Sequence, residues 1–114
     1  NIQRGMGIKV IYALQPFATC CEKKFSDEEK EIFSIVDASA YKTYQTIQLI
    51  DKKAYMDYKN ILQENCSYYN FDFVDCNDHL GNSNFDKQWL FVDRAHLTDL
   101  GNKHVAEFIL SKAL

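Results

Sequence analysis

The order of apolar and polar positions predicts short strands separated by longer amphipathic helices. Residues Ile8 to Leu14 form a nearly continuous, β-branched apolar run, which is typical of a strand buried on both faces of a parallel sheet. Pro16 ends this run, because proline has no amide proton to donate to a sheet. Tyr68 to Asp75 predicts a second strand, and Trp89 to Val92 predicts either a short strand or an extended connection.

Two helices are predicted between the first two strands. Ser26 and Glu29 have the spacing of a capping box, so we expect a helix from about Asp27 to Val36. A longer helix is expected from about Ser39 to Glu64, because apolar residues recur there at three- and four-residue steps. The predicted buried stripe of this helix is Tyr44, Ile47, Ile50, Ala54, Tyr58 and Ile61, widened by Tyr41, Tyr55 and Leu62.

A last helix is predicted from about Leu100 to Ala113. Either Thr98 or Asp99 can cap its start by accepting a hydrogen bond from a free backbone amide. Gly101, which has no side chain, would let the helix begin close to a neighbouring backbone. The side expected to be buried carries Leu100, Val105, Phe108 and Ile109.

Size and charge narrow the function classes. The 114 residues correspond to one domain or less, with 46% hydrophobic residues and a net charge of -3. Nucleic-acid binding is not expected, because basic pairs such as Lys23-Lys24 are interleaved with acids and are predicted to be solvated. No apolar run approaches the roughly 20 residues that span a bilayer. No signal peptide is recognisable, and the compartment remains open.

The four cysteines leave the redox state open. Cys20 and Cys21 are adjacent and cannot easily pair with each other. A bridge between Cys66 and Cys76 and buried free thiols are both compatible with the sequence. The nearby run from Asp75 to His79 does not have the spaced ligand pairs of a zinc site, so no metal site is predicted there.

The chemistry of the chain is concentrated just before its last helix. Asp93 and His96 place a carboxylate and an imidazole three residues apart. In a Ser-His-Asp hydrolase the imidazole takes a proton from the nucleophile, while the carboxylate fixes the imidazole tautomer and stabilises the cation. The alternative is a loop carboxylate beside a surface histidine without catalytic function.

The residues around this pair extend the pattern to D-x-x-H-L-T-x-x-G-N, followed by Val105, Ala106 and Ile109. This segment resembles the last sequence block of the SGNH hydrolases, the GDSL-type esterase and lipase superfamily. A looser likeness includes Val10 to Pro16 and Phe71 to Asp75, which look like later strands of that fold. The resemblance implies a partial, three-layer, flavodoxin-like α/β/α fold over residues 1–114. It also implies that His96 is the general base and Asp93 its orienting carboxylate.

Three motifs of that superfamily are not present: the Gly-Asp-Ser turn with the nucleophile, and the Gly and Asn motifs of the oxyanion hole. The chain is therefore predicted to be the C-terminal part of an acyl-ester hydrolase, inactive alone and completed by an N-terminal half. Its substrate would be a small-molecule, carbohydrate or lipid ester. Two alternatives remain: a non-catalytic structural or interaction module, and a self-contained flavodoxin-like binding domain. The hypothesis that the chain is the C-terminal part of a hydrolase also predicts an exposed apolar sheet edge.

Overall fold

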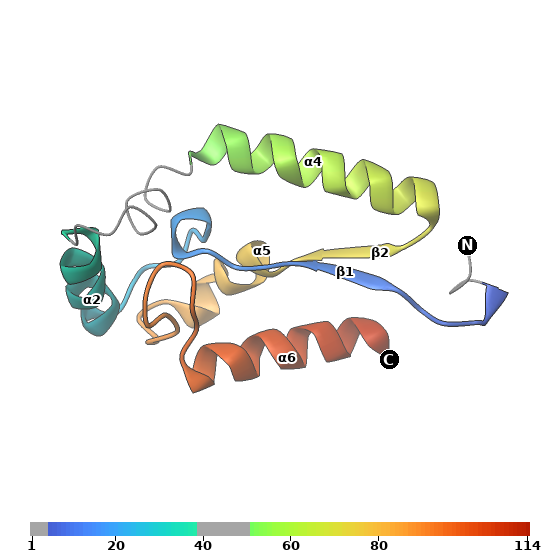
Figure 1. Ribbon diagram of the computed structural model, residues 1–114. Helices are drawn as coiled ribbons and strands as arrows, with labels where there is room; N and C mark the ends of the chain where they lie inside the picture. The colour runs from blue at the N-terminus through green and yellow to red at the C-terminus, as the bar shows by residue number, and fades with distance from the viewer. Residues whose placement is uncertain (1–4, 39–50) are drawn as a thin grey trace.

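The computed structural model describes residues 5–38 and 51–114 (Figure 1). The elements are β1 (Ile11–Leu14), η1 (Ala18–Cys20), α2 (Asp27–Asp37), α4 (Lys52–Tyr69), β2 (Asp72–Asp75), α5 (Cys76–Leu80), η2 (Ser83–Phe85) and α6 (Asp99–Ala113). The chain is therefore a mixed α/β structure, as the sequence predicts. No helix within the described ranges is both long and apolar enough to cross a membrane.

β1 and β2 form a parallel pair, with Ile11 opposite Asp72 and Leu14 opposite Asp75. Helix α4 runs along one side of this pair and α6 along the other (Figure 1). The main core lies beyond the carboxyl ends of the strands, where η1, α2 and α5 meet the segment before Asp93. Its buried members are Ala18, Cys21, Phe33, Leu80, Leu90 and Phe91. The core thus lies next to the segment that carries Asp93 and His96, because Leu90 and Phe91 belong to it.

The predicted burial of the first strand on both faces is wrong. Tyr12 is 41% exposed and Ala13 is also exposed, whereas Leu14 is buried. Within residues 5–38 and 51–114 the sheet has two strands, so each strand has one edge without a partner strand there. The strand also begins three residues later than predicted, and Ile8 is exposed.

The predicted long helix is corrected at both ends. Residues 39–50 lie outside the described part, but Asp51 has an extended backbone and its side chain accepts a hydrogen bond from Ala54 N at 2.6 Å. A helix therefore begins at Lys52 rather than continuing from Ser39. It ends at Tyr69, because Asn70 adopts the left-handed conformation with φ 61°. The aromatic pair Tyr68-Tyr69, predicted to open the second strand, closes this helix instead.

The inward face of α4 is rotated by one residue from the predicted stripe. Tyr58 and Ile61 are exposed, while Lys59 and Cys66 are buried. Lys59 can face inward because its ammonium group lies 3.0 Å from the carboxylate of Asp75. An apolar pattern cannot reveal a face on which a lysine is buried by ion pairing.

Helix α6 begins as predicted, with Thr98 as its N-cap: the side-chain oxygen accepts from Gly101 N at 3.1 Å. A Cβ atom at Gly101 would lie 2.4 Å from the carbonyl oxygen of Leu90, so the predicted close backbone approach is confirmed. Leu100 is 41% exposed, and its predicted burial is wrong. Gly101 faces the interior at the start of the helix, so Leu100 before it faces solvent. The other residues expected on the buried side, Val105, Phe108 and Ile109, are half-buried.

All four cysteines are free thiols, and Cys21, Cys66 and Cys76 are buried. The possible bridge between Cys66 and Cys76 is thus not formed, and the alternative of buried thiols is confirmed. Burial raises the pKa of Cys76 to about 11, with the carboxylate of Asp75 adding to the shift. The thiol therefore stays protonated at neutral pH and is a poor nucleophile.

An aromatic cluster joins α5 to α6. The ring of His79 stacks on Phe108 at 4.1 Å and lies edge-on to Phe85 at 5.1 Å. His104 packs against Phe85 at 4.6 Å and its Nε2 lies 2.9 Å from Gln88 Oε1. Burial, followed by the proximity of His104 and Lys112, lowers the pKa of His79.

Substitution of Gly101 by alanine is expected to destabilise the fold by about 1 to 3 kcal/mol, the usual range for overpacking. The new methyl group would meet the Leu90 carbonyl, which is backbone and cannot rotate away. Urea unfolding measures the effect. Gly5→Ala is the matched control, since the added Cβ meets nothing within 4 Å beyond its own chain neighbours, and it should not lower the unfolding midpoint. Equal midpoints for the two variants would contradict the close approach.

The stability of the chain is expected to decrease as the pH falls below about 6.5, the pKa of an unfolded histidine. His79 has a lower pKa when folded, so below that pH the unfolded chain takes up a proton that the folded chain does not. The loss continues until the pH has passed through the folded pKa. His79→Phe keeps a ring against Phe108 and should flatten the profile. Melting temperatures of both proteins between pH 5 and 8 measure the difference; identical slopes would contradict it.

Candidate functional site

The segment from Phe91 to Leu97 is a short loop that closes on itself. Phe91 and Leu97 form an antiparallel bridge, and Val92 N donates to His96 O at 3.0 Å. The segment Trp89–Val92 is predicted from the sequence to be either a short strand or an extended connection. It is an extended connection, and it pairs with the other end of its own loop. We refer to residues 91–97 as the Asp93–His96 loop.

The two predicted site residues face each other. His96 Nδ1 lies 2.9 Å from Asp93 Oδ2 and 3.0 Å from Oδ1. Asp93 Oδ1 also accepts from the backbone amides of Ala95 at 2.8 Å and His96 at 2.7 Å. Because a carboxylate only accepts, the hydrogen of a neutral imidazole belongs on Nδ1 here, which leaves the lone pair on Nε2. This is the tautomer that a general base requires.

The carboxylate of Asp93 stays ionised although it is largely covered. Burial raises its pKa, but the hydrogen bonds from Ala95 N, the His96 ring and His96 N outweigh that effect and hold the pKa below its usual value. The side chain of Asp93 is 15% exposed, whereas that of His96 is 73% exposed. The imidazole is therefore open to solvent, while the carboxylate that contacts it is largely covered.

A shallow hollow of about 570 Å³ borders the loop on the α6 side. Its lining residues are Trp89, Val92, Leu97, Thr98, Asp99 and Leu100. The indole nitrogen of Trp89 donates to Phe91 O at 2.9 Å, which holds this ring against the loop backbone. The hollow thus includes Val92 and Leu97 of the loop, and most of its lining side chains are apolar.

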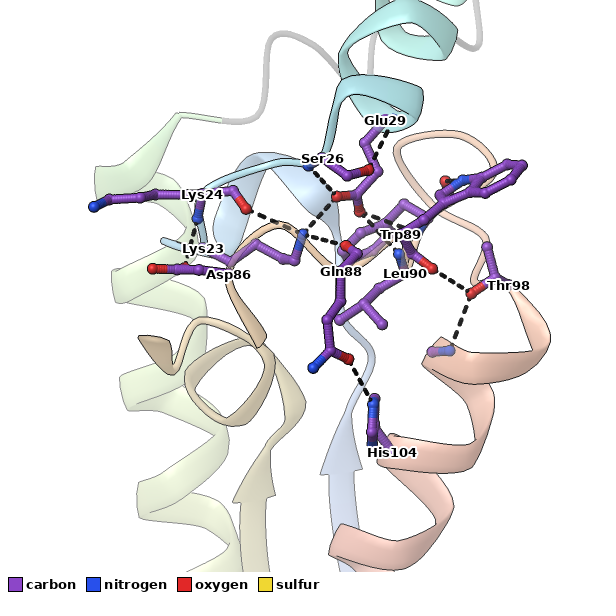
Figure 2. Close-up of polar contacts among 12 residues, drawn as sticks. Lys23, Lys24, Ser26, Glu29, Asp86, Gln88, Trp89, Leu90, Thr98 and His104 are labelled. Carbon is purple, nitrogen blue, oxygen red and sulfur yellow. Dashed lines mark hydrogen bonds and ion pairs between the residues drawn. The ribbon is translucent and has the colours of Figure 1, made fainter. Parts of the chain in front are cut away.

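Buried Glu29 anchors the segment that leads into the loop (Figure 2). Its Oε2 accepts from the backbone amides of Leu90 at 3.2 Å and Phe91 at 3.1 Å. Its Oε1 completes the predicted capping box by accepting from Ser26 N at 2.8 Å. The capping box is confirmed, but the sequence gives no signal that the same carboxylate binds residues 61 and 62 positions further along the chain.

Lys23 is the cationic partner of Glu29. Its ammonium group lies 2.5 Å from Glu29 Oε1 and donates to Gln88 O at 2.9 Å (Figure 2). Both side chains of the pair have no exposed surface. The prediction that the Lys23-Lys24 pair is solvated is therefore wrong for Lys23, because Lys23 turns inward to neutralise a buried carboxylate.

A second anchor holds the tip of the loop. Arg94 donates from Nε and Nη2 to the two carboxylate oxygens of Asp37, at 2.8 and 2.6 Å, and its guanidinium lies 4.6 Å from the centre of the Phe33 ring. The Arg94 hydrogen bond lowers the pKa of Asp37 despite its partial burial. The carbonyl of Arg94 accepts from Ala18 N at 2.8 Å, and Gln15 Nε2 donates to the carbonyl of Ala95 at 3.2 Å.

The polar run after β2 has structural partners. Asp75 caps α5 by accepting from Asn77 N at 2.9 Å and pairs with Lys59, while His79 stacks on Phe108. Asn77 Oδ1 in turn accepts from Phe17 N at 2.8 Å. Over residues 5–38 and 51–114, no group of three His, Cys, Asp or Glu side chains is arranged to hold a metal ion.

No serine completes the pair within the described ranges. Ser26 is buried as the cap of α2, and the hydroxyls of Ser34 and Ser111 donate to carbonyl groups one turn earlier in their own helices. The hydrogen bonds of the His96 ring go to Asp93. The described part of the chain thus contains the paired Asp93 and His96 but no serine hydrogen-bonded to them.

Substitution of Glu29 by glutamine is expected to cost about 3 to 5 kcal/mol, because it leaves the buried ammonium group of Lys23 without a counter-charge. Urea unfolding measures the loss. The control makes the same chemical change at an exposed site: Glu107→Gln removes an ion pair with Lys103 at 3.8 Å and should cost less than about 1 kcal/mol. Similar losses in the free energy of unfolding at both sites would show that the buried Lys23–Glu29 pair contributes no more to stability than an exposed ion pair.

No protein-family model matches this chain, and no curated protein sequence matches it significantly. The likeness to the SGNH hydrolases therefore rests on the sequence motif alone and stays a prediction.

Proposed function

We propose that this chain is the C-terminal part of an SGNH-type serine ester hydrolase and supplies the His-Asp half of its catalytic triad. The observation that carries the proposal is the contact of His96 Nδ1 with Asp93 at 2.9 Å, together with the solvent exposure of the imidazole. The motif D-x-x-H-L-T-x-x-G-N around this pair supports it. The pair has the arrangement of a general base and its orienting carboxylate.

In the proposed reaction a serine from the N-terminal half attacks the carbonyl carbon of an acyl ester. Nε2 of His96 takes the serine proton as the new C–O bond forms, and Asp93 stabilises the resulting imidazolium. The same proton passes to the leaving alcohol oxygen when the ester bond breaks, which leaves an acyl-enzyme. Water, activated by His96 in the same way, then releases the acid and the free serine. No cofactor is needed.

The proposed fold is a partial three-layer α/β/α sandwich completed by the N-terminal half. The parallel pairing of β1 with β2 and the placement of α4 and α6 on opposite sides of the pair support it (Figure 1). The exposure of Ile8 and Tyr12, at 51% and 41%, fits the apolar sheet surface that further strands would cover.

The alternative function is a non-catalytic structural or interaction module with an SGNH-like or flavodoxin-like fold. It is favoured by one observation: across residues 5–38 and 51–114, the ring of His96 makes no hydrogen bond to a serine hydroxyl. This alternative assigns Asp93 to capping its own loop amides and leaves His96 without a chemical role.

The two functions are separated by hydrolysis of p-nitrophenyl acetate by the longer protein that joins this chain to its upstream segment. His96→Ala should abolish turnover, and Asp93→Asn should lower kcat by about four orders of magnitude because it leaves the wrong tautomer. His104→Ala is the matched control, since His104 contacts Gln88 and the α5–α6 aromatic cluster rather than the loop.

The upstream coding sequence provides an independent check. The proposal expects a Gly-Asp-Ser turn there, directly after a buried strand.

In the hydrolysis assay, turnover that is unchanged by His96→Ala would remove the catalytic role of His96 and leave the non-catalytic alternative.

A further inference from the structure

Arg94 lies between the two members of the Asp93–His96 pair but points to a different element. We propose that Arg94 and Asp37 act as a positioning clamp, which ties the tip of the loop to α2 and so keeps the imidazole of His96 in its Nδ1–H tautomer against Asp93. The benefit of this clamp for catalysis rests on the proposed function. The clamp itself is a property of this chain alone.

The geometry of the clamp is specific to arginine. Nε and Nη2 of one guanidinium meet both oxygens of one carboxylate, at 2.8 and 2.6 Å, which fixes the plane of the contact as well as its distance. The face of the same guanidinium covers the Phe33 ring at 4.6 Å. A lysine could keep the charge but neither the paired hydrogen bonds nor the planar stacking.

The backbone of the loop is held at the same place. Ala18 N donates to the carbonyl of Arg94 at 2.8 Å, and Gln15 Nε2 donates to the carbonyl of Ala95 at 3.2 Å. Residue 94 is therefore fixed through its side chain by α2 and through its carbonyl by η1. The middle of the turn is anchored independently of its ends, which are joined by the Phe91–Leu97 bridge.

The imidazole itself has little packing to hold it. The side chain of His96 is 73% exposed, so its orientation depends on where the backbone places it relative to Asp93. Asp93 Oδ1 is shared between the ring and the amides of Ala95 and His96, at distances of 2.7 to 3.0 Å. A small rotation of the turn would change all three contacts together. Fixing residue 94 therefore fixes the approach of Nδ1 to the carboxylate.

The competing explanation is that the two amide hydrogen bonds to Asp93 hold the turn without help. Under that explanation Arg94 and Asp37 would only contribute to stability, and their loss would leave the tautomer of His96 unchanged. The state of the ring therefore separates the two explanations.

The test is a two-bond ¹H–¹⁵N correlation spectrum of the histidine rings in the full chain, recorded at a pH where the imidazoles are neutral. In the unmodified chain, the protonated-nitrogen shift should belong to Nδ1 of His96 and the lone-pair shift to Nε2. Free histidine prefers the opposite tautomer. Arg94→Lys and Asp37→Asn should both move the two shifts of His96 toward each other, as the Nε2–H form becomes populated.

Three controls are contained in the same design. Lys103→Gln removes an exposed ion pair with Glu107 on α6 and should leave His96 unchanged. The rings of His79 and His104, which pack in the α5–α6 cluster, report whether the fold is intact. The readout needs neither serine nor substrate, so a failure of the hydrolase proposal would leave the result of this experiment untouched.

A change of His96 alone in both variants supports the clamp. An unchanged His96 in both variants overturns it in favour of the self-sufficient turn. A simultaneous change of all three histidines overturns it as well, because Arg94 would then be a determinant of the whole fold rather than of the loop.

Discussion

The structure depends on one ion pair buried without any solvent contact, that of Lys23 with Glu29. Removing two charges from water costs several kcal/mol per ion, and their mutual attraction repays this only when the remaining donors and acceptors are also satisfied. Here they are: Lys23 also donates to Gln88 O, and Glu29 also accepts from the amides of Ser26, Leu90 and Phe91. No buried side-chain polar atom in the described ranges is left without a partner. The pair therefore joins the start of α2 to the segment that enters the Asp93–His96 loop.

Several features could be predicted because they depend on neighbouring residues. The capping box of Ser26 and Glu29 and the cap at Thr98 are contacts within one helical turn. The contact between Asp93 and His96 is also local, since three residues of turn bring the two side chains together. Gly101 was identified because a missing side chain at a helix start leaves room for a backbone.

The errors come from charge pairs and backbone conformations that an apolar pattern does not show. Lys23 reads as a surface lysine because an apolar pattern shows neither its ion pair with Glu29, six positions away, nor its hydrogen bond to the Gln88 carbonyl, 65 positions away. Lys59 reads as polar surface for the same reason, although it faces Asp75 and turns the apolar stripe of α4 outward. The helix boundary at Tyr69 is set by the left-handed backbone of Asn70, which overrides the strand preference of two tyrosines. The periodicity of apolar residues contains information neither on charge pairing nor on the backbone conformation of a single residue.

Both ends of helix α2 bind the Asp93–His96 loop or the segment that leads into it. Glu29, in its first turn, binds the amides of Leu90 and Phe91 at the entrance of the loop, while Asp37, its last residue, binds Arg94 at the tip. Eight residues separate the two carboxylates, a rise of about 12 Å along a helix. A helix is stiff over that length, so entrance and tip cannot shift independently. A side chain as exposed as that of His96 has little packing of its own, and this shared support from one rigid element gives the loop a defined position without burying the imidazole.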